Sequence, residues 1–159
     1  MSDISSPFER DPLEDGRQSE RALLVRRGLG RLVRDLGYAM AVELTLASGR
    51  RADAVALGPK GEIWIVEIKS SLEDLKADSK WPDYRAHCDR LYFATHAEVP
   101  LDAFPEEAGL ILCDRYGGEI LRPAPEHKLA GAARKAMTLR FARAAAGRLH
   151  DLMDPGLAG

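Results

Sequence analysis

The segment that most constrains the fold is a turn, Gly-Pro-Lys-Gly at positions 58–61, set between apolar stretches at 51–57 and 63–69. Glycine and proline clustered in this way favour a chain reversal, and a short loop joins strands that run antiparallel. The sequence therefore predicts a β-hairpin over residues 51–69, around which the remaining elements must pack.

Elements of both kinds surround this hairpin. A further apolar stretch at 38–46 precedes it across a second turn at 47–50, so three strands form an antiparallel meander. Period and composition predict the remaining elements: a helix from 19 to 36, helical stretches at 71–79 and 83–90, strands at 91–94, 109–113 and 120–122, and an alanine-rich helix ending near 153. We expect an α/β (α+β) fold with a central mixed sheet flanked by helices.

The first helix has one apolar and one basic side. Its apolar positions recur at helical spacing and form a single stripe: Ala22, Val25, Leu29, Leu32 and Leu36. Three basic residues lie together on the opposite side: Arg27, Arg31 and Arg34. Gly37 follows the last turn and is expected to end the helix.

Size and composition indicate one globular domain. The chain has 159 residues, of which 45% are hydrophobic and 30% charged. We expect a flexible tail over 1–16, one domain over 17–153 and a short tail over 154–159. No apolar run approaches the roughly 18 residues of a membrane span. The two cysteines, Cys88 and Cys113, are expected to be reduced thiols in a cytoplasmic protein, and the four histidines lack the spacing of zinc ligands.

Charge is distributed unevenly although the net charge is only −2. Residues 17–34 carry six arginines against Glu20, and residues 122–148 carry seven basic residues against Glu126. Residues 60–119 hold thirteen acids and seven basic residues. An anionic partner could therefore meet two basic edges of an acidic body; the alternative is that both edges are solvated helix faces.

Three charged residues of the hairpin are placed to act together. Glu67 and Lys69 are two residues apart in a strand and so project from one face. A loop centred on Lys60 pairs Leu57 with Ile63 and Val55 with Ile65. The same register brings Asp53 opposite Glu67, with Cβ atoms about 4.5–5.5 Å apart.

Two carboxylates at this separation repel each other unless something offsets their charge. A divalent cation does so, because Mg²⁺ binds one or two carboxylates and keeps water in its other positions. Lys69 could then stabilise charge that develops on a phosphate. The alternative is a solvated face on which Asp53 and Glu67 pair with Arg51 and Lys69.

These residues resemble a known nuclease signature. Ala52-Asp53 followed by Glu67-Ile68-Lys69 is similar to the motif of the PD-(D/E)-x-K, or restriction-endonuclease-like, superfamily, and the element order to its αβββαβ core. Longer stretches resemble the bacterial MmcB-type DNA-repair proteins: ELTL (43–46), SGRRAD (48–53), VEIKSS (66–71), KWPDY (80–84), CDRLYFA (88–94) and KAMTLR (135–140).

The resemblance implies a Mg²⁺- or Mn²⁺-dependent site that hydrolyses phosphodiester bonds of DNA in repair, beside other repair proteins. Asp53 and Glu67 would be metal ligands and Lys69 the catalytic lysine. Many relatives use a further glutamate, for which Glu43 and Glu20 are candidates. A three-residue turn over 48–50 would set Thr45 opposite Asp53 and bring Glu43 to the same face.

Further residues are candidates for DNA contacts. They combine basic and aromatic side chains near the predicted site or on the first helix: Arg50, Arg51, Lys80, Trp81, Tyr84, Arg27, Arg31 and Arg34. We expect both basic segments to lie on the side of the carboxylates. For Trp81 and Tyr84, the alternative to a DNA contact is packing against the sheet. Asp74 and Asp78 are interpreted as acids on an ordinary helix surface. A non-catalytic nucleic-acid-binding module and a partner-binding domain are the competing function classes.

Overall fold

The computed structural model describes residues 16–157, without the side chains of 16–19 and 157. The tail predicted over 1–16 lies outside these residues except at Gly16, where the first helix begins. The elements follow in this order: α1 (Gly16–Asp35), β1 (Ala39–Thr45), β2 (Arg51–Leu57), β3 (Ile63–Ile68), α2 (Leu72–Ala77), the 3₁₀ helix η1 (Trp81–His87), β4 (Arg90–Thr95), the 3₁₀ helix η2 (Leu101–Ala103), β5 (Gly109–Cys113), β6 (Gly118–Arg122), α3 (Gly131–Met153) and the 3₁₀ helix η3 (Pro155–Leu157).

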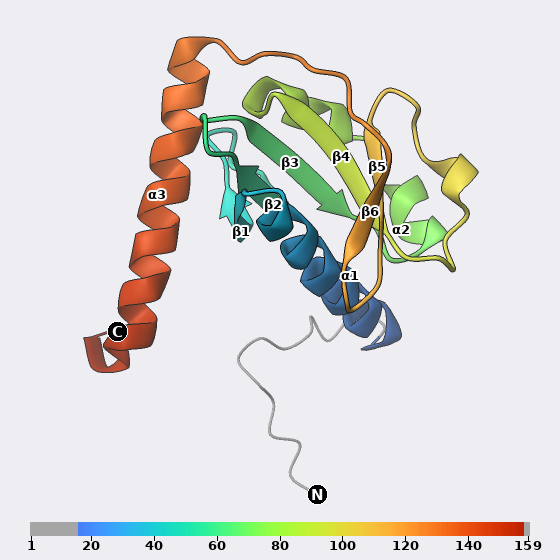
Figure 1. The fold of residues 1–159 in the computed structure, drawn as a ribbon, viewed down its shortest axis with the longest axis horizontal. Coiled ribbons are helices and arrows are strands. Elements are labelled where there is room, and N and C mark those ends of the chain that lie inside the picture. Colours follow the sequence, from blue (N-terminus) through green and yellow to red (C-terminus); the bar gives the residue numbers. More distant parts are fainter. Residues whose placement is uncertain (1–15, 158–159) are drawn as a thin grey trace, which may run out of the picture.

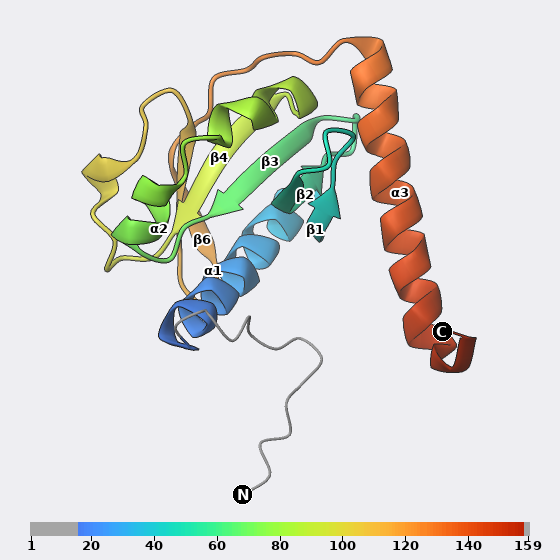
Figure 2. The same cartoon turned by 180° about the vertical axis from the view of Figure 1, so that it is seen from behind.

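The six strands form one mixed sheet in chain order, from β1 at one edge to β6 at the other (Figures 1 and 2). The pairs β1–β2, β2–β3 and β5–β6 are antiparallel, whereas β3–β4 and β4–β5 are parallel. Parallel neighbours need a crossover, which α2 and η1 supply between β3 and β4. The predicted mixed sheet flanked by helices is confirmed.

The hairpin register agrees with the prediction. Leu57 pairs with Ile63 and Val55 with Ile65, and the ladder continues to Ala54 and Val66. Its turn is closed by the N–H of Gly58 donating to the carbonyl of Glu62 (2.8 Å), and Gly61 has a φ of 91°. A positive φ is readily adopted only by glycine, which explains why this turn fixes the register.

Different helices cover the two faces of the sheet. On one face, α1 packs Val25, Leu29 and Val33 against a cluster that includes Ala54 and Val66. Figure 1 shows α1 crossing this face. The predicted stripe is wrong at its end: Val33 is buried and Leu36 is 46% exposed, because α1 ends at Asp35.

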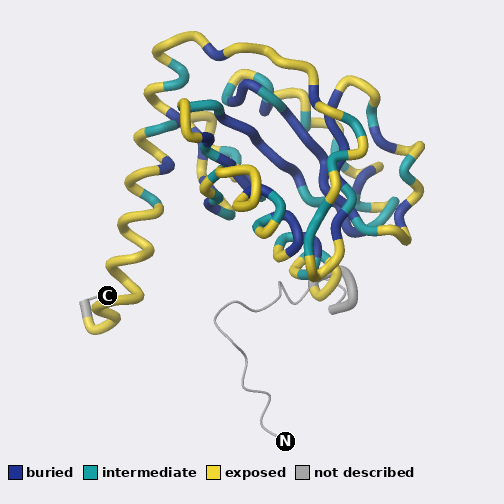
Figure 3. The backbone as a smooth tube through the Cα atoms, in the orientation of Figure 1, coloured by how far each residue is buried: buried dark blue, intermediate teal, exposed yellow. Residues whose placement is uncertain are grey.

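The opposite face is covered by α3 and η1. Met137 and Phe141 of α3 and Tyr84 of η1 share a core cluster with Val55 and Ile65. Burial ends partway along α3, and its last turns are exposed (Figure 3). None of the helices that the structure describes could cross a membrane.

A buried ion pair fastens α3 to the sheet. Asp89 accepts two hydrogen bonds from the Arg134 guanidinium (2.6 and 2.7 Å), and it also accepts from the N–H groups of Ile63 (2.8 Å) and Leu129 (2.9 Å). Burial raises the pKa of the Asp89 carboxyl, but these donors lower it further, to about 2. The charged carboxylate is therefore stabilised in the folded protein.

Arg134→Ala is expected to lower the free energy of unfolding by about 3 kcal/mol, because it leaves a buried carboxylate without its cation. Because the folded-state pKa of Asp89 is depressed, the pair stabilises the fold above about pH 4, and its contribution is lost as the pH falls toward 2. Urea denaturation between pH 2 and 7 measures both effects. Lys135→Ala, at an exposed position of the same helix, is the control and should cost less than about 0.5 kcal/mol.

Candidate active site

Asp53 and Glu67 meet where the β2–β3 ladder ends. The N–H of Asp53 donates to Oε2 of Glu67 (2.9 Å), and the N–H of Ile68 donates to Oδ2 of Asp53 (2.8 Å). Side-chain oxygens thus take the place of backbone carbonyls in these two bonds. Continuing the register past Ala54 and Val66 places Asp53 opposite Glu67 on the face that carries Val55 and Ile65.

Both carboxylates resist ionisation. Glu67 is only 4% exposed. Its burial, and then the charge of Asp53, raise the pKa of Glu67 to about 8. Burial also raises the pKa of Asp53, with smaller contributions from the charges of Asp74 and Glu43. The two carboxyls therefore titrate as a pair, and the loss of the second proton is strongly opposed.

Tyr84 closes one side of the pair. Its hydroxyl donates to the carbonyl of Arg51 (3.1 Å). Burial raises the pKa of Tyr84, and so does the negative charge of Glu67. Tyr84 thus joins η1 to β2 by a hydrogen bond and lies near Glu67 of β3.

Lys69 directly follows β3 in the chain, and its side chain is buried. Its Nζ lies 2.8 Å from Oδ2 of Asp78, and the two side chains are 9% and 17% exposed. Burial lowers the pKa of Lys69, but Asp78, Asp74 and Glu67 offset that effect, so the pKa is raised and the ammonium stays charged. Lys69 is therefore buried beside the C-terminal end of α2.

Asp74 of α2 and Asp78, which caps that helix, therefore act on the site, whereas the sequence favoured an ordinary helix surface for both. Asp78 caps the C-terminus of α2, and the charge of Asp74 acts on both Asp53 and Lys69. The sequence does contain a signal for a helix at this place. Ser71 and Asp74 have the spacing of an N-terminal cap, and Ser71 Oγ accepts from the N–H of Asp74 (3.1 Å). This cap starts a helix directly after Lys69, and Asp78 lies one turn beyond Asp74.

Glu43 lies beside the pair without joining it. The β1–β2 loop is Ala47–Gly49 rather than 48–50, because Leu46 pairs with Arg50. The observed pairs on either side, 42 with 54 and 44 with 52, place Glu43 rather than Thr45 across from Asp53.

The backbone at Glu43 has a φ of 50°, and its exposed carboxylate lies 4.0 Å from Arg51. Glu20 is exposed on α1, whose apolar stripe packs on the other face of the sheet. Within residues 16–157, no three acidic, histidine or cysteine side chains are grouped to hold a metal ion. In this structure neither glutamate is grouped with Asp53 and Glu67, so a third carboxylate from Glu43 or Glu20 stays a prediction.

The aromatic candidates for DNA contacts pack against the core, Trp81 partly buried and Tyr84 fully buried. Trp81 lies edge-on to Phe93, with ring centroids 5.5 Å apart, and Tyr84 is buried. This arrangement matches the packing alternative. Among the basic candidates, Arg50 pairs with Asp83 (3.1 Å) and Lys80 is exposed.

The two basic segments lie on different faces of the sheet. Arg27, Arg31 and Arg34 are exposed on α1, which packs on the face opposite Asp53 and Glu67. The expectation that both segments lie on the side of the carboxylates is therefore wrong for α1. It fails because the apolar stripe of α1 packs with Ala54 and Val66, whereas Asp53 and Glu67, the residues next to these two in the chain, project from the other face. The segment on α3 does pack on the face of the carboxylates.

A solved structure of a protein of unknown function from Silicibacter pomeroyi is 45% identical and superposes with a TM-score of 0.85, covering 87% of this chain and 95% of that chain. Among curated proteins, none matches this sequence significantly. The model of one family, described as DNA repair protein MmcB-like, matches residues 9–156. The chain therefore belongs to the MmcB-like family of DNA repair proteins.

Proposed function

We propose that this protein is a Mg²⁺- or Mn²⁺-dependent DNA nuclease of the PD-(D/E)-x-K type that hydrolyses phosphodiester bonds during DNA repair. The observation that carries the proposal is the buried pair of opposed carboxylates, Asp53 and Glu67, with a charged Lys69 beside them. Without a cation this arrangement is unfavourable at neutral pH, since burial and mutual repulsion both oppose ionisation.

The donor set fits a hard divalent cation. The backbone hydrogen bonds to the pair go to Oδ2 of Asp53 and Oε2 of Glu67, so within the described part of the chain the other oxygen of each carboxylate accepts none from the backbone. Two carboxylate oxygens with water in the remaining positions are a usual set for Mg²⁺. A bound cation would offset the repulsion, activate a water and stabilise negative charge on the phosphate.

The protein's own groups have distinct roles in this proposal. The reciprocal backbone bonds fix the orientation of Asp53 and Glu67 before any ligand binds, which lowers the cost of ordering the site. The Lys69 ammonium group has three N–H donors, and one of them points to Asp78 in the ion pair. The remaining donors can act on a phosphate oxygen as it becomes more negative.

The proposal is tested by incubating labelled single-stranded, duplex and branched DNA with the protein and Mg²⁺ or Mn²⁺, beside thermal melts with and without metal. Wild type is expected to cleave at least one substrate, and metal should raise its melting temperature. Asp53→Asn removes one ligand, so cleavage and the metal-induced shift should both disappear. Asp102→Asn, at an exposed position in η2, should leave both unchanged. Wild type that neither cleaves nor responds to metal would refute the nuclease.

A further inference from the structure

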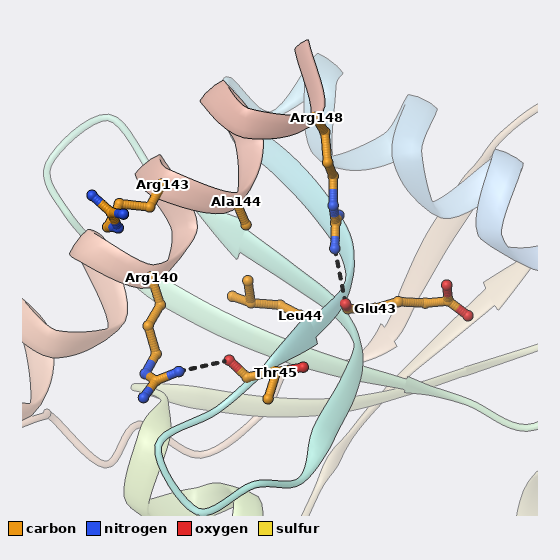
Figure 4. Close-up of a pocket in the computed structure, with 7 residues that line it drawn as sticks. All are labelled: Glu43, Leu44, Thr45, Arg140, Arg143, Ala144 and Arg148. Atoms are coloured by element: carbon orange, nitrogen blue, oxygen red, sulfur yellow. Dashed lines mark hydrogen bonds between the residues drawn. The ribbon is translucent and has the colours of Figure 1, made fainter. Parts of the chain in front are cut away.

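A basic cleft lies between α3 and the edge strand β1 (Figure 4). It has a volume of about 300 Å³. On one side are Arg140, Arg143, Ala144 and Arg148 of α3, and on the other are Glu43, Leu44 and Thr45 of β1. The floor of the cleft is the flank of β1, because Leu44 is buried in the core.

The three arginines have no anionic partner within the described residues. None of the ion pairs found there includes Arg140, Arg143 or Arg148. Arg140 donates to the carbonyl of Thr45 (3.3 Å), and Arg148 donates to the carbonyls of Val42 and Glu43 (2.9 Å to the latter). A guanidinium has five N–H donors, so these contacts leave several free.

The one acid that lines the cleft does not neutralise it. Figure 4 shows the side chain of Glu43 directed away from the three arginines. Its carboxylate lies 4.0 Å from Arg51 on the neighbouring strand instead. The cleft therefore carries three uncompensated positive charges in a protein whose net charge is −2.

This cleft adjoins the carboxylate pair. Glu43 lies across from Asp53 on the neighbouring strand, and adjacent strands are about 4.8 Å apart. The helix that carries the arginines packs on the same face of the sheet as Val55 and Ile65, which are next to Asp53 and Glu67 along their strands. A polymer bound in the cleft can therefore continue toward the carboxylates.

We infer that the α3–β1 cleft binds the phosphate backbone of a DNA strand beside the bond that the carboxylate pair acts on. From Arg140 to Arg148 the helix rises about 12 Å at 1.5 Å per residue, over which one strand of a DNA duplex advances three or four nucleotides at about 3.4 Å each along the duplex axis. A guanidinium group can bind a phosphate through two parallel N–H bonds, and it stays charged over the whole pH range in which proteins are studied. The choice of DNA as the ligand rests on the proposed function; the anion site itself rests on the cleft.

The test measures binding without cleavage. Fluorescence anisotropy of a labelled single strand and of its duplex is recorded with the full chain in EDTA, between 50 and 200 mM salt. The triple variant Arg140→Gln, Arg143→Gln, Arg148→Gln should lose at least tenfold in affinity at the lowest salt, and its salt dependence should fall by about 2 in slope, as two or three phosphate contacts are lost. The control is Arg27→Gln, Arg31→Gln, Arg34→Gln, which removes the same charge from the opposite face and should stay within twofold of wild type.

A single variant separates binding from folding. Arg140 and Arg148 also bond to β1, whereas the Arg143 side chain makes no hydrogen bond within the described residues. Arg143→Gln should therefore weaken binding about threefold and leave the melting temperature unchanged. Wild-type affinity in the α3 triple variant and in Arg143→Gln would overturn the inference. The inference would also be overturned if the α1 control lost as much DNA affinity as the α3 triple variant, or if polyglutamate at equal charge concentration displaced the DNA. If wild type binds through α3 but cleaves no DNA with metal, the inference stands and the nuclease fails.

Discussion

Glu67→Gln is expected to abolish metal-dependent cleavage and, in the same protein, to raise the stability of the metal-free fold at alkaline pH. Glutamine has the size of glutamate, and its amide oxygen can still accept the N–H of Asp53 that Oε2 of Glu67 accepts. It cannot repel Asp53 and supplies no charge to a cation. Loss of function and gain of stability should therefore occur together, which a merely structural carboxylate would not produce.

The contribution of Glu67 to the free energy of unfolding changes with pH in one direction. The folded protein raises the pKa of Glu67 to about 8, above the value of about 4.5 in an unfolded chain. The folded state thus binds this proton more tightly, so its contribution to stability is complete below about pH 4.5 and is lost as the pH rises through 8. Glutamine never ionises, so the stability advantage of the variant over wild type should grow by roughly 4 kcal/mol from pH 5 to pH 9.

Chemical denaturation in EDTA at several pH values from 5 to 9 measures this difference. Glu106→Gln, which removes an exposed carboxylate, is the control and should show no trend with pH. With saturating Mg²⁺ the order should reverse at pH 8, because the cation stabilises only the protein that retains both ligands. A difference between Glu67→Gln and wild type that is constant across the pH range would contradict the strained pair.

Lys69→Met is expected to reduce cleavage at least 100-fold and to lower the free energy of unfolding by about 2 kcal/mol. The first effect follows from loss of the positive charge beside the carboxylates. The second follows from the burial of the ion pair, since Asp78 would keep its charge at 17% exposure without the ammonium 2.8 Å away. Turnover should fall more than DNA affinity, because the charge acts mainly as the phosphate becomes more negative.

The double variant Lys69→Met, Asp78→Asn separates the two roles. Removing both charges of a buried pair restores most of the stability that either single change costs, so the double variant should melt close to wild type. It should nevertheless remain inactive. Recovery of cleavage in the double variant would show that Lys69 acts only by neutralising Asp78, and would exclude it as the catalytic lysine.

The hairpin was predictable because local chemistry determines it. The turn at 58–61 fixes the pairing of Leu57 with Ile63, and alternation along each strand then carries that register to Asp53 and Glu67. The mixed sheet was predictable for a similar reason: the strand segments and the helical stretches differ in period over their whole length.

Other parts of the site depend on contacts between distant segments, which one sequence does not specify. The positive φ at Glu43 changes where that side chain points, and it occurs at a residue for which sequence predicts ordinary strand geometry. The face of the sheet that α1 covers depends on the path of the chain between α1 and β1, which periodicity does not specify. The bond between Asp89 and Arg134 joins residues 45 positions apart. The first two of these features determine which charged side chains lie near the carboxylates.

The hydrogen bonds from α3 to β1 also have a consequence for how copies of this protein behave together. β1 is an edge strand, and the carbonyls of Val42, Glu43 and Thr45 would otherwise be open to a strand from another molecule. Arg140 and Arg148 occupy these acceptors, and bulky cations along the edge keep a second chain at a distance. A chain shortened within α3 would therefore present an open strand edge, so that this helix also protects the sheet from self-association.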